Sequence, residues 1–175
     1  MVPLPSQKFG GTGLKVACLS RGGREPGFKK TNQDNCFAFE KYIQHHQSLF
    51  GTFDGHGPNG HLASSYVKHH LPLNLVTQLS NNEDVGVALT KGFLQVDAAM
   101  TKTPSVDCEF SGTTAVVSLL QGNTLTTGWV GDSRAVIGRG EGGGPMQAVA
   151  LTSDHKPIDP GEKERILEAN GRVER

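Results

Sequence analysis

The chain has 175 residues, and its 17 Lys and Arg balance 17 Asp and Glu, so the formal net charge is zero. This length suits one domain, and a neutral chain has no overall field to attract nucleic acid or an anionic membrane. It contains no run of 18 apolar residues and no secretory signal pattern, so we expect no membrane span. Cys18, Cys36 and Cys108 form neither a zinc pattern nor a disulfide framework. Free thiols are typical of a reducing compartment, and we expect an intracellular protein of the cytoplasm or nucleus.

The first part of the chain predicts a leader followed by short strands. Residues 1–13 are polar and rich in Gly and Pro, which is typical of a flexible leader, and we place the domain at residues 14–175. Alternating or apolar stretches bounded by turn residues predict strands, and these lie at residues 14–20, 35–40 and 49–53. A basic loop at residues 22–32 separates the first two strands.

Two helices are predicted next, because the spacing of apolar residues changes to that of a helix. The first covers residues 58–71, and Pro72 should end or kink it because proline lacks the backbone N–H. The second has one apolar stripe that should lie on a sheet, formed by Val85, Leu89, Gly92, Val96 and Met100.

The remaining chain returns to strands and closes with one helix. The predicted strands lie at residues 113–120, 124–130, 135–139 and 147–151. Gly122 lies in the short loop between the first two, which predicts a hairpin. Asp159 and Pro160 have the pattern of a helix start, and Gly171 can end that helix. Separate runs of strands and helices in this order favour an α+β fold with antiparallel sheets.

Three aspartates occupy strand boundaries and form the strongest chemical signal. Asp54 lies in the string F-D-G-H-G, after an apolar strand and before a helix, while Asp34 and Asp132 flank other strands. Carboxylates and backbone carbonyls at such positions suit Mg²⁺, Mn²⁺ or Ca²⁺ better than zinc. Each aspartate alone has an ordinary structural reading: an Asp-Gly turn for Asp54, an Asx turn for Asp34, and a turn carboxylate paired with Arg134 for Asp132.

Several strings together resemble the metal-dependent protein phosphatases of type 2C. In family order they are K-K-T-N-Q-D-N, L-F-G-T-F-D-G-H-G-P-N-G-H, F-S-G-T-T-A-V-V, W-V-G-D-S-R-A, L-T-S-D-H-K-P and P-G-E-K-E-R-I. The resemblance extends from about residue 14 to the C-terminus. It implies an antiparallel β-sandwich flanked by helices, in α-β-β-α layers, and hydrolysis of phosphoserine and phosphothreonine through a metal-bridging hydroxide. Phosphoproteins would be the substrates, and two Mg²⁺ or Mn²⁺ ions the cofactors, with a third weak site.

The resemblance also implies roles for individual residues. Asp54 corresponds to the carboxylate that bridges two metals, and His56 to the acid that protonates the leaving alcohol. The metal set would be completed by the Gly55 carbonyl, Gln33, Asp34 and, at the third metal, Asp132. Lys29 corresponds to an arginine that binds the substrate phosphate, and Lys30 is expected to share this role. Gln33 replaces the glutamate of many members, and Lys29 lacks the bidentate geometry of arginine.

The absence of two strings of the family pattern limits these expectations. A D-G-x-W-D string and a second D-N string, downstream of Asp34-Asn35, would supply further metal-binding aspartates, and neither occurs in these 175 residues. We therefore expect a partial catalytic domain, incomplete at its C-terminus, that binds metal weakly and has little activity alone. Unpaired strands of an incomplete sheet should favour self-association. The alternative function is a catalytically dead phosphatase-like module for binding or regulation, and a weaker one is a related regulator of the same fold.

Overall fold

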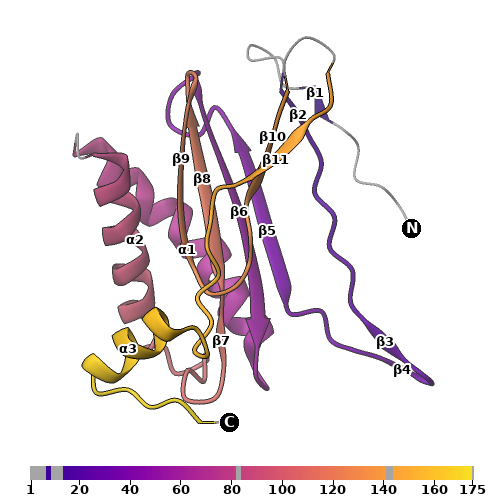
Figure 1. The fold of residues 1–175 in the computed structure, drawn as a ribbon, viewed down its shortest axis with the longest axis vertical. Helices are drawn as coiled ribbons and strands as arrows, with labels where there is room; N and C mark the ends of the chain where they lie inside the picture. The colour runs from indigo at the N-terminus through magenta and orange to yellow at the C-terminus, as the bar shows by residue number, and fades with distance from the viewer. Residues whose placement is uncertain (1–6, 9–13, 82–83, 141–143, 175) are drawn as a thin grey trace.

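The computed structural model describes residues 7–8, 14–81, 84–140 and 144–174. Its centre is an antiparallel sheet in the order β5-β6-β8-β9 (Figure 1). These strands are β5 (Asp34–Glu40), β6 (Gln47–His56), β8 (Ala115–Gln121) and β9 (Thr124–Val130). The short β7 (Gly112–Thr113) pairs with the far end of β6, beyond β8. The long strand β6 is therefore the element on which the rest of the sheet is ordered.

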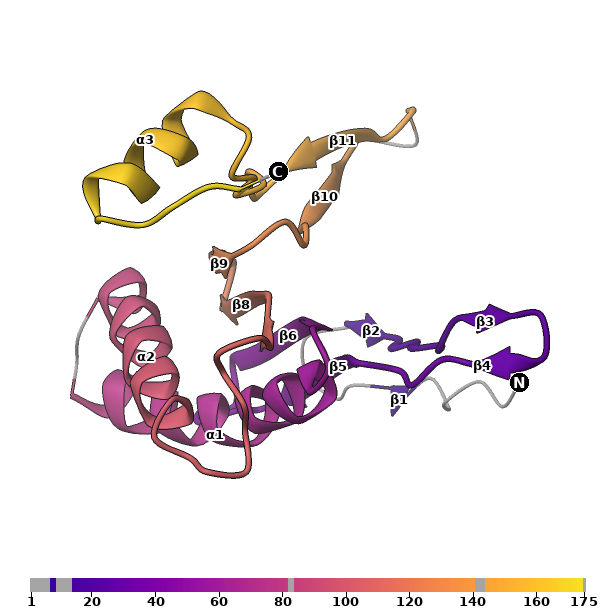
Figure 2. The same cartoon turned by 90° about the horizontal axis from the view of Figure 1, so that it is seen from below.

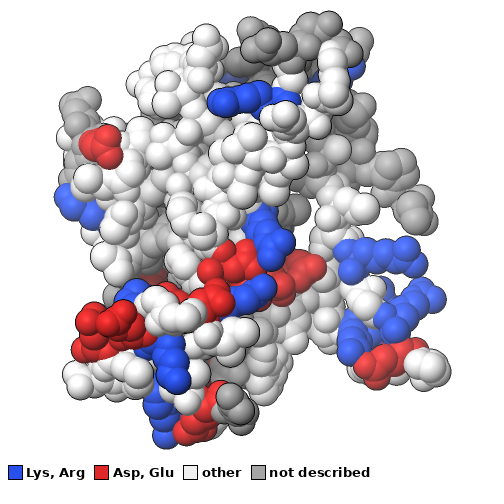
Figure 3. Space-filling view, viewed as in Figure 1, with Lys and Arg blue, Asp and Glu red and all other residues white. Residues whose placement is uncertain are grey.

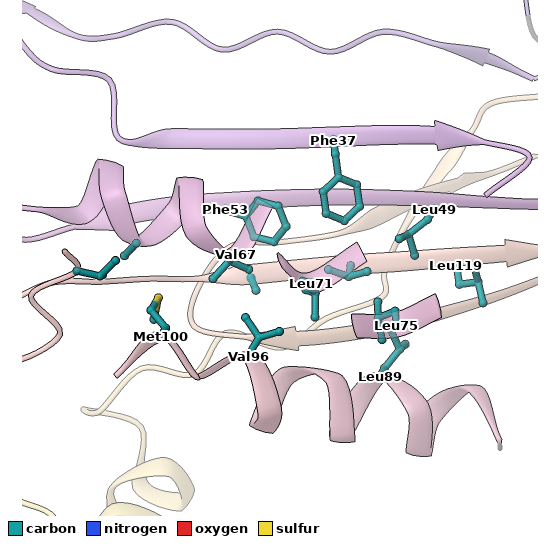
Figure 4. Packing of buried hydrophobic residues seen from close by; sticks show 14 residues of the cluster. Phe37, Leu49, Phe53, Val67, Leu71, Leu75, Leu89, Val96, Met100 and Leu119 are labelled. Carbon is teal, nitrogen blue, oxygen red and sulfur yellow. The ribbon is translucent and has the colours of Figure 1, made fainter. Parts of the chain in front are cut away.

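Two helices cover one face of this sheet and enclose the core (Figure 2). They are α1 (Gly60–Ser80) and α2 (Val85–Met100), which pack against each other and against β6 and β9. Asp84 caps α2, since its carboxylate accepts hydrogen bonds from the N–H groups of Gly86 and Val87. In Figure 4 the side chains of Phe53, Leu71 and Val96 point into the layer between sheet and helices. Burial of this apolar layer stabilises the fold and holds β6 in place.

Smaller elements lie outside the central sheet. Three two-stranded hairpins are formed by β1 (Gln7–Lys8) with β2 (Lys15–Val16), β3 (Arg24–Glu25) with β4 (Phe28–Lys29), and β10 (Val136–Arg139) with β11 (Gln147–Ala150). The last element is α3 (Pro160–Glu168). Figure 2 shows β10 and β11 on the side of the sheet opposite α1 and α2. The structure thus has helices and antiparallel sheets, and the predicted α+β class is confirmed.

Most sequence predictions for the central elements agree with the structure, whereas those for residues 7–32 differ from it. The strand predicted at residues 14–20 is reduced to Lys15–Val16, and the predicted loop at 22–32 contains the β3–β4 hairpin. Within the predicted leader, Gln7–Lys8 form β1, while residues 1–6 and 9–13 lie outside the described part of the chain. No helix among the described residues is both long enough and apolar enough to cross a bilayer.

The sequence predicted that Pro72 ends or kinks the first helix, and the structure shows that the helix does not end there. Helix α1 continues through Pro72 to Ser80, well beyond the predicted end at residue 71. Pro72 is buried, and its carbonyl accepts a hydrogen bond from the Tyr42 hydroxyl. Apolar contacts of Leu71 and Leu75 on either side keep the chain helical. Tertiary packing therefore outweighs the local cost of proline inside the helix.

Candidate active site

The sheet register places Asp34 directly opposite Asp54 on β5 and β6. The pKa of Asp54 is raised, first by partial removal from water and then by the negative charges of Asp34 and Asp132, whereas His56 opposes the shift. Mutual repulsion of carboxylates favours either a bound proton or a bound cation. The three aspartates singled out in the sequence are thus close enough for Asp34 and Asp132 to shift the pKa of Asp54.

Glycines around Asp54 allow the backbone to approach closely. A Cβ on Gly55 would lie 2.3 Å from the Gly60 carbonyl oxygen and 2.6 Å from the Gln33 carbonyl oxygen, so no side chain fits there. The Gly55 N–H donates to that Gln33 carbonyl at 3.2 Å. Gly57 has φ +79°, a left-handed conformation that glycine adopts without strain. The Asp-Gly pattern is therefore explained by packing between β5, β6 and the start of α1.

A buried threonine connects Asp54 to the loop that carries Asp132. The Thr114 hydroxyl accepts a hydrogen bond from the Asp54 N–H at 3.1 Å and lies 2.6 Å from the Ser133 hydroxyl. The Thr114 N–H in turn donates to the Asp54 carbonyl at 2.9 Å. Gly131 has φ +95°, and a Cβ there would lie 2.7 Å from the Thr114 side chain. Thr114 and Ser133 were missed as site residues, although both lie in the strings that carried the resemblance.

Arg134, the partner that the ordinary reading gave to Asp132, forms its ion pair with Asp154 instead. Arg134 makes a two-pronged contact with Asp154, at 2.6 Å from Nε and 2.8 Å from the second nitrogen. Lys156 contacts the same carboxylate at 2.8 Å. These cations hold the pKa of Asp154 far below its usual range. Asp132 lies close enough to raise the pKa of Asp54, and its charge also acts on Arg134.

A small cavity of about 190 Å³ lies beside the paired aspartates. Its wall is formed by residues of β5, β6 and two loops, namely Leu19, Ser20, Asp34, Asn35, Cys36, Thr52, Phe53, Asp54 and Ser133. We call it the acidic cavity. Within the residues that the structure describes, no three His, Cys, Asp or Glu side chains already converge as a metal site. The donors present are therefore two paired carboxylates, with Asp132 nearby.

Gln33 and His56 are fixed near the ends of the same strands. The Gln33 amide donates to the Gly57 carbonyl at 3.0 Å, while its Oε1 is buried against Gly60 and has no hydrogen-bond partner. An unpaired buried oxygen costs free energy of folding, and a water molecule or a cation at this position would remove that cost. The exposed His56 has its imidazole over Gly112, whose lack of a side chain leaves the necessary room. His56 is one residue beyond Gly55 on β6, at the edge of the site.

The two lysines of the predicted phosphate site lie elsewhere. Lys29 and Lys30 line a separate cavity of about 410 Å³ on the β3–β4 hairpin, together with Arg21 and Arg24. We call it the basic cavity. Figure 3 shows acidic side chains gathered near the middle of this face and a basic group apart from them, at the right edge where Figure 1 places the hairpin. The structure does not bring the lysines to the aspartates, but Ser20 lines both cavities.

Comparisons of the sequence with known proteins indicate its family. Residues 19–175 match the family model described as "Protein phosphatase 2C". The chain is 31% identical to "Probable protein phosphatase 2C 1" of Arabidopsis thaliana, over 99% of the chain and 44% of that relative. It is 41% identical to "Probable protein phosphatase 2C 64" of rice, Oryza sativa subsp. japonica, over 85% of the chain and 37% of the relative. The chain thus spans less than half the length of these curated relatives.

Solved structures show the same fold. A serine-threonine phosphatase 2C from Toxoplasma gondii superposes with a TM-score of 0.78 over 95% of the chain and 57% of its own length, at 24% identity. A sex-determining protein of C. elegans superposes with a TM-score of 0.70 over 90% of the chain and 38% of its own, at 26% identity. The fold therefore agrees over almost all of this chain, which covers 57% of the first structure and 38% of the second.

Proposed function

Because the chain belongs to the protein phosphatase 2C family, we propose that it carries part of a metal-dependent active site for hydrolysis of phosphoserine and phosphothreonine in proteins. The observation that supports this most directly is the pairing of Asp34 with Asp54, joined to the Asp132 loop through Thr114 and Ser133. The three carboxylates come from separate parts of the chain, and their mutual repulsion favours a bound cation. We further propose that the protein acts in the cytoplasm or nucleus.

The residues present fit hard divalent cations, which prefer oxygen ligands. Asp54 would bind two Mg²⁺ or Mn²⁺ ions, with the Gly55 carbonyl as a further ligand of one of them. Asp34 and the unpaired Oε1 of Gln33 would support the same ions directly or through water, and Asp132 would hold a third ion weakly. When bound, such ions lower the pKa of water and neutralise phosphate charge. The protein's own part is to hold these oxygens at one end of β5 and β6.

His56 and the basic cavity would act on the substrate itself. The exposed His56 would donate a proton to the serine or threonine oxygen as the phosphorus–oxygen bond breaks, a step worth about 10²–10⁴-fold in rate. Lys29 and Lys30 would bind the phosphate, and since they line the basic cavity, the β3–β4 hairpin must approach the aspartates for this role. We propose that binding of the phosphate brings the two cavities together.

The described donor set is small, so we expect weak metal binding and little turnover by these 175 residues. Two cations held mainly by Asp54 and Asp34 would repel each other with few negative partners. Hydrolysis of p-nitrophenyl phosphate should therefore be slow even with saturating Mn²⁺. A rate equal to that of a longer family member would contradict this expectation.

Mn²⁺ binding provides the direct test of the site. The signal of free Mn²⁺ in electron paramagnetic resonance, titrated with protein, should give at least about tenfold weaker binding for Asp54→Asn than for wild type, because the shared ligand loses its charge. Asp159→Asn is the matched control, since the Asp159 side chain makes no capping hydrogen bond. Equal Mn²⁺ affinity in Asp54→Asn and wild type would contradict the proposed metal site.

A phosphatase-like binding module is the second candidate function. It is favoured by the finding that no three-residue metal group is formed among the described residues. The two functions differ in turnover, measured on a phosphoserine peptide with Mn²⁺ present. Slow hydrolysis that disappears in Asp54→Asn supports the enzyme, whereas binding of the peptide with no Mn²⁺-dependent hydrolysis supports the module.

A further inference from the structure

The basic cavity contains more positive charge than the bound phosphate of a substrate requires. Its wall carries four cationic side chains and no acidic one, with the lining residues Ser20, Arg21, Gly22, Arg24, Lys29, Lys30 and Asn32. All four cations are exposed at the surface. The hairpin that carries them is ordered by a hydrogen bond from the Lys30 N–H to the Gly23 carbonyl at 3.0 Å. The four positive charges are therefore exposed to solvent on a hydrogen-bonded β-hairpin.

Two of these cations are placed at an electrostatic cost. Arg24 and Lys29 are direct cross-strand partners in the β3–β4 pair, and like charges in that position destabilise a hairpin. Lys30 is paired with Glu25 at 2.5 Å. Among the described residues, no carboxylate forms an ion pair with Arg21, Arg24 or Lys29. An external anion between these side chains would relieve their repulsion.

The position of the basic cavity relates this anion to the substrate. Ser20 lines both cavities, and its hydroxyl accepts a hydrogen bond from the Asn32 amide at 2.6 Å. A peptide with its phosphorylated residue at the acidic cavity would therefore have neighbouring residues at the basic one, since an extended chain advances about 3.3–3.6 Å per residue.

Resting on the proposed function, we propose that Arg21 and Arg24 form a specificity site for acidic side chains close to the phosphorylated serine or threonine. Lys29 remains available for the phosphate, and Lys30 becomes available when its contact with Glu25 is broken. Glu25 then competes with the substrate, because it already occupies Lys30. The preferred substrates would be phosphoproteins with Glu or Asp within a few residues of the phosphorylation site.

Peptide binding without metal tests this site separately from catalysis. The probes are fluorescein-labelled, unphosphorylated peptides with a central serine flanked on one side or the other by three Glu, or by three Gln as the neutral match. Fluorescence anisotropy with the 175-residue chain, in EDTA and low salt, should show tighter binding of a Glu peptide, by about fivefold or more. High salt should abolish the difference, since the contacts are exposed ion pairs.

Variants distinguish the named arginines from general positive charge. The double variant Arg21→Gln/Arg24→Gln should lose the preference for Glu peptides, while Lys102→Gln/Lys163→Gln, which removes the same charge from other exposed positions, should keep it.

Glu25→Gln should bind the Glu peptide more tightly, because Lys30 is released. A misfolded variant would not give tighter binding. Equal binding of Glu and Gln peptides, or equal losses in the two double variants, would overturn the proposal.

A kinetic measurement separates this inference from the proposed function. With Mn²⁺, kcat/KM for a phosphoserine peptide with flanking Glu should exceed that for the Gln match, and the ratio should fall toward one in Arg21→Gln/Arg24→Gln. If anisotropy shows the preference but no peptide is hydrolysed, the acidic-peptide site stands and the catalytic proposal fails. If peptides are hydrolysed without any preference, the catalytic proposal stands and the specificity site fails.

Discussion

At the scale of single residues, the cluster of Arg134, Asp154 and Lys156 determines which carboxylates remain free for the site. Asp154 is only 13% exposed and binds two cations at once. The guanidinium of Arg134 is therefore hydrogen-bonded to Asp154, while the charge of Asp132 acts on it as well. The sequence identified Asp132 and Arg134 but could not decide between their pairing and a metal role, because Asp154 lies 20 residues further along the chain. Only the folded structure shows with which carboxylate Arg134 forms its ion pair.

This cluster predicts a pH-dependent contribution to stability. The pKa of Asp154 in the folded protein lies below its unfolded value of about 3.9, since hydrogen bonds and charges of Arg134 and Lys156 favour the carboxylate. Its stabilising effect is therefore present above about pH 4 and is lost as the pH falls toward the folded pKa. In urea titrations, Asp154→Asn should be less stable than wild type at neutral pH, and the difference should shrink at about pH 3.

Asp159→Asn provides the comparison for that measurement, because no capping hydrogen bond of the Asp159 side chain is lost. The two variants carry the same chemical change on neighbouring parts of the chain. A difference between Asp154→Asn and wild type that stays constant from neutral to acidic pH would show that the ion pairs do not stabilise the fold.

At the scale of elements, the apolar stripe of α2 was predicted from spacing alone, and its ends agree with the structure. The role of Gly92 within the stripe was not predictable. A Cβ at Gly92 would lie 2.6 Å from Cδ2 of Leu75, a fully buried residue of α1. Periodicity shows which face of a helix is buried, but the distance to the neighbouring helix depends on side chains that lie elsewhere in the sequence. Pro72 in α1 illustrates the same limit.

Gly92→Ala should therefore destabilise the protein, by about 1 kcal/mol. Alanine gains about 1 kcal/mol in helix propensity, but overpacking of a tight contact costs about 1–3 kcal/mol. Gly161→Ala in α3 is the matched control, because a Cβ there meets nothing within 4 Å. That variant should be neutral or slightly more stable in urea unfolding. If both variants were stabilised equally, the close approach of α1 and α2 at Gly92 would be refuted.

At the scale of the whole molecule, the sequence predicted the fold class, but not how the proposed site residues are distributed in space. The strings around Asp34 and Asp54 could be recognised, whereas their opposition depends on the register between β5 and β6. Lys29 was assigned to the phosphate from its place in a string, yet it lies in another cavity. Local sequence patterns indicate strands and turns, whereas the distance between two loops depends on how the strands pair in the sheet.

The same sheet leaves β9 at its edge, which predicts self-association. Among the described strands, β9 pairs only with β8, so its other side presents unpaired backbone groups. Beside it lies an apolar cavity of about 640 Å³ whose wall includes Leu89 and Phe93 of α2. Open edges of this kind readily pair with a second chain. We expect the weight-average sedimentation coefficient of the 175-residue chain to rise with protein concentration.

A lysine on the edge strand should suppress this association, since charged edge residues oppose pairing. Leu125 on β9 is 37% exposed, and Leu125→Lys should keep the sedimentation coefficient close to that of a monomer at concentrations where wild type associates. Leu73→Lys, at a site 70% exposed on α1, removes the same apolar side chain away from the edge and should associate like wild type. If Leu73→Lys alone abolished association, the contact would lie on the helical face. A wild-type chain that remained monomeric at every concentration would show that the β9 edge does not pair.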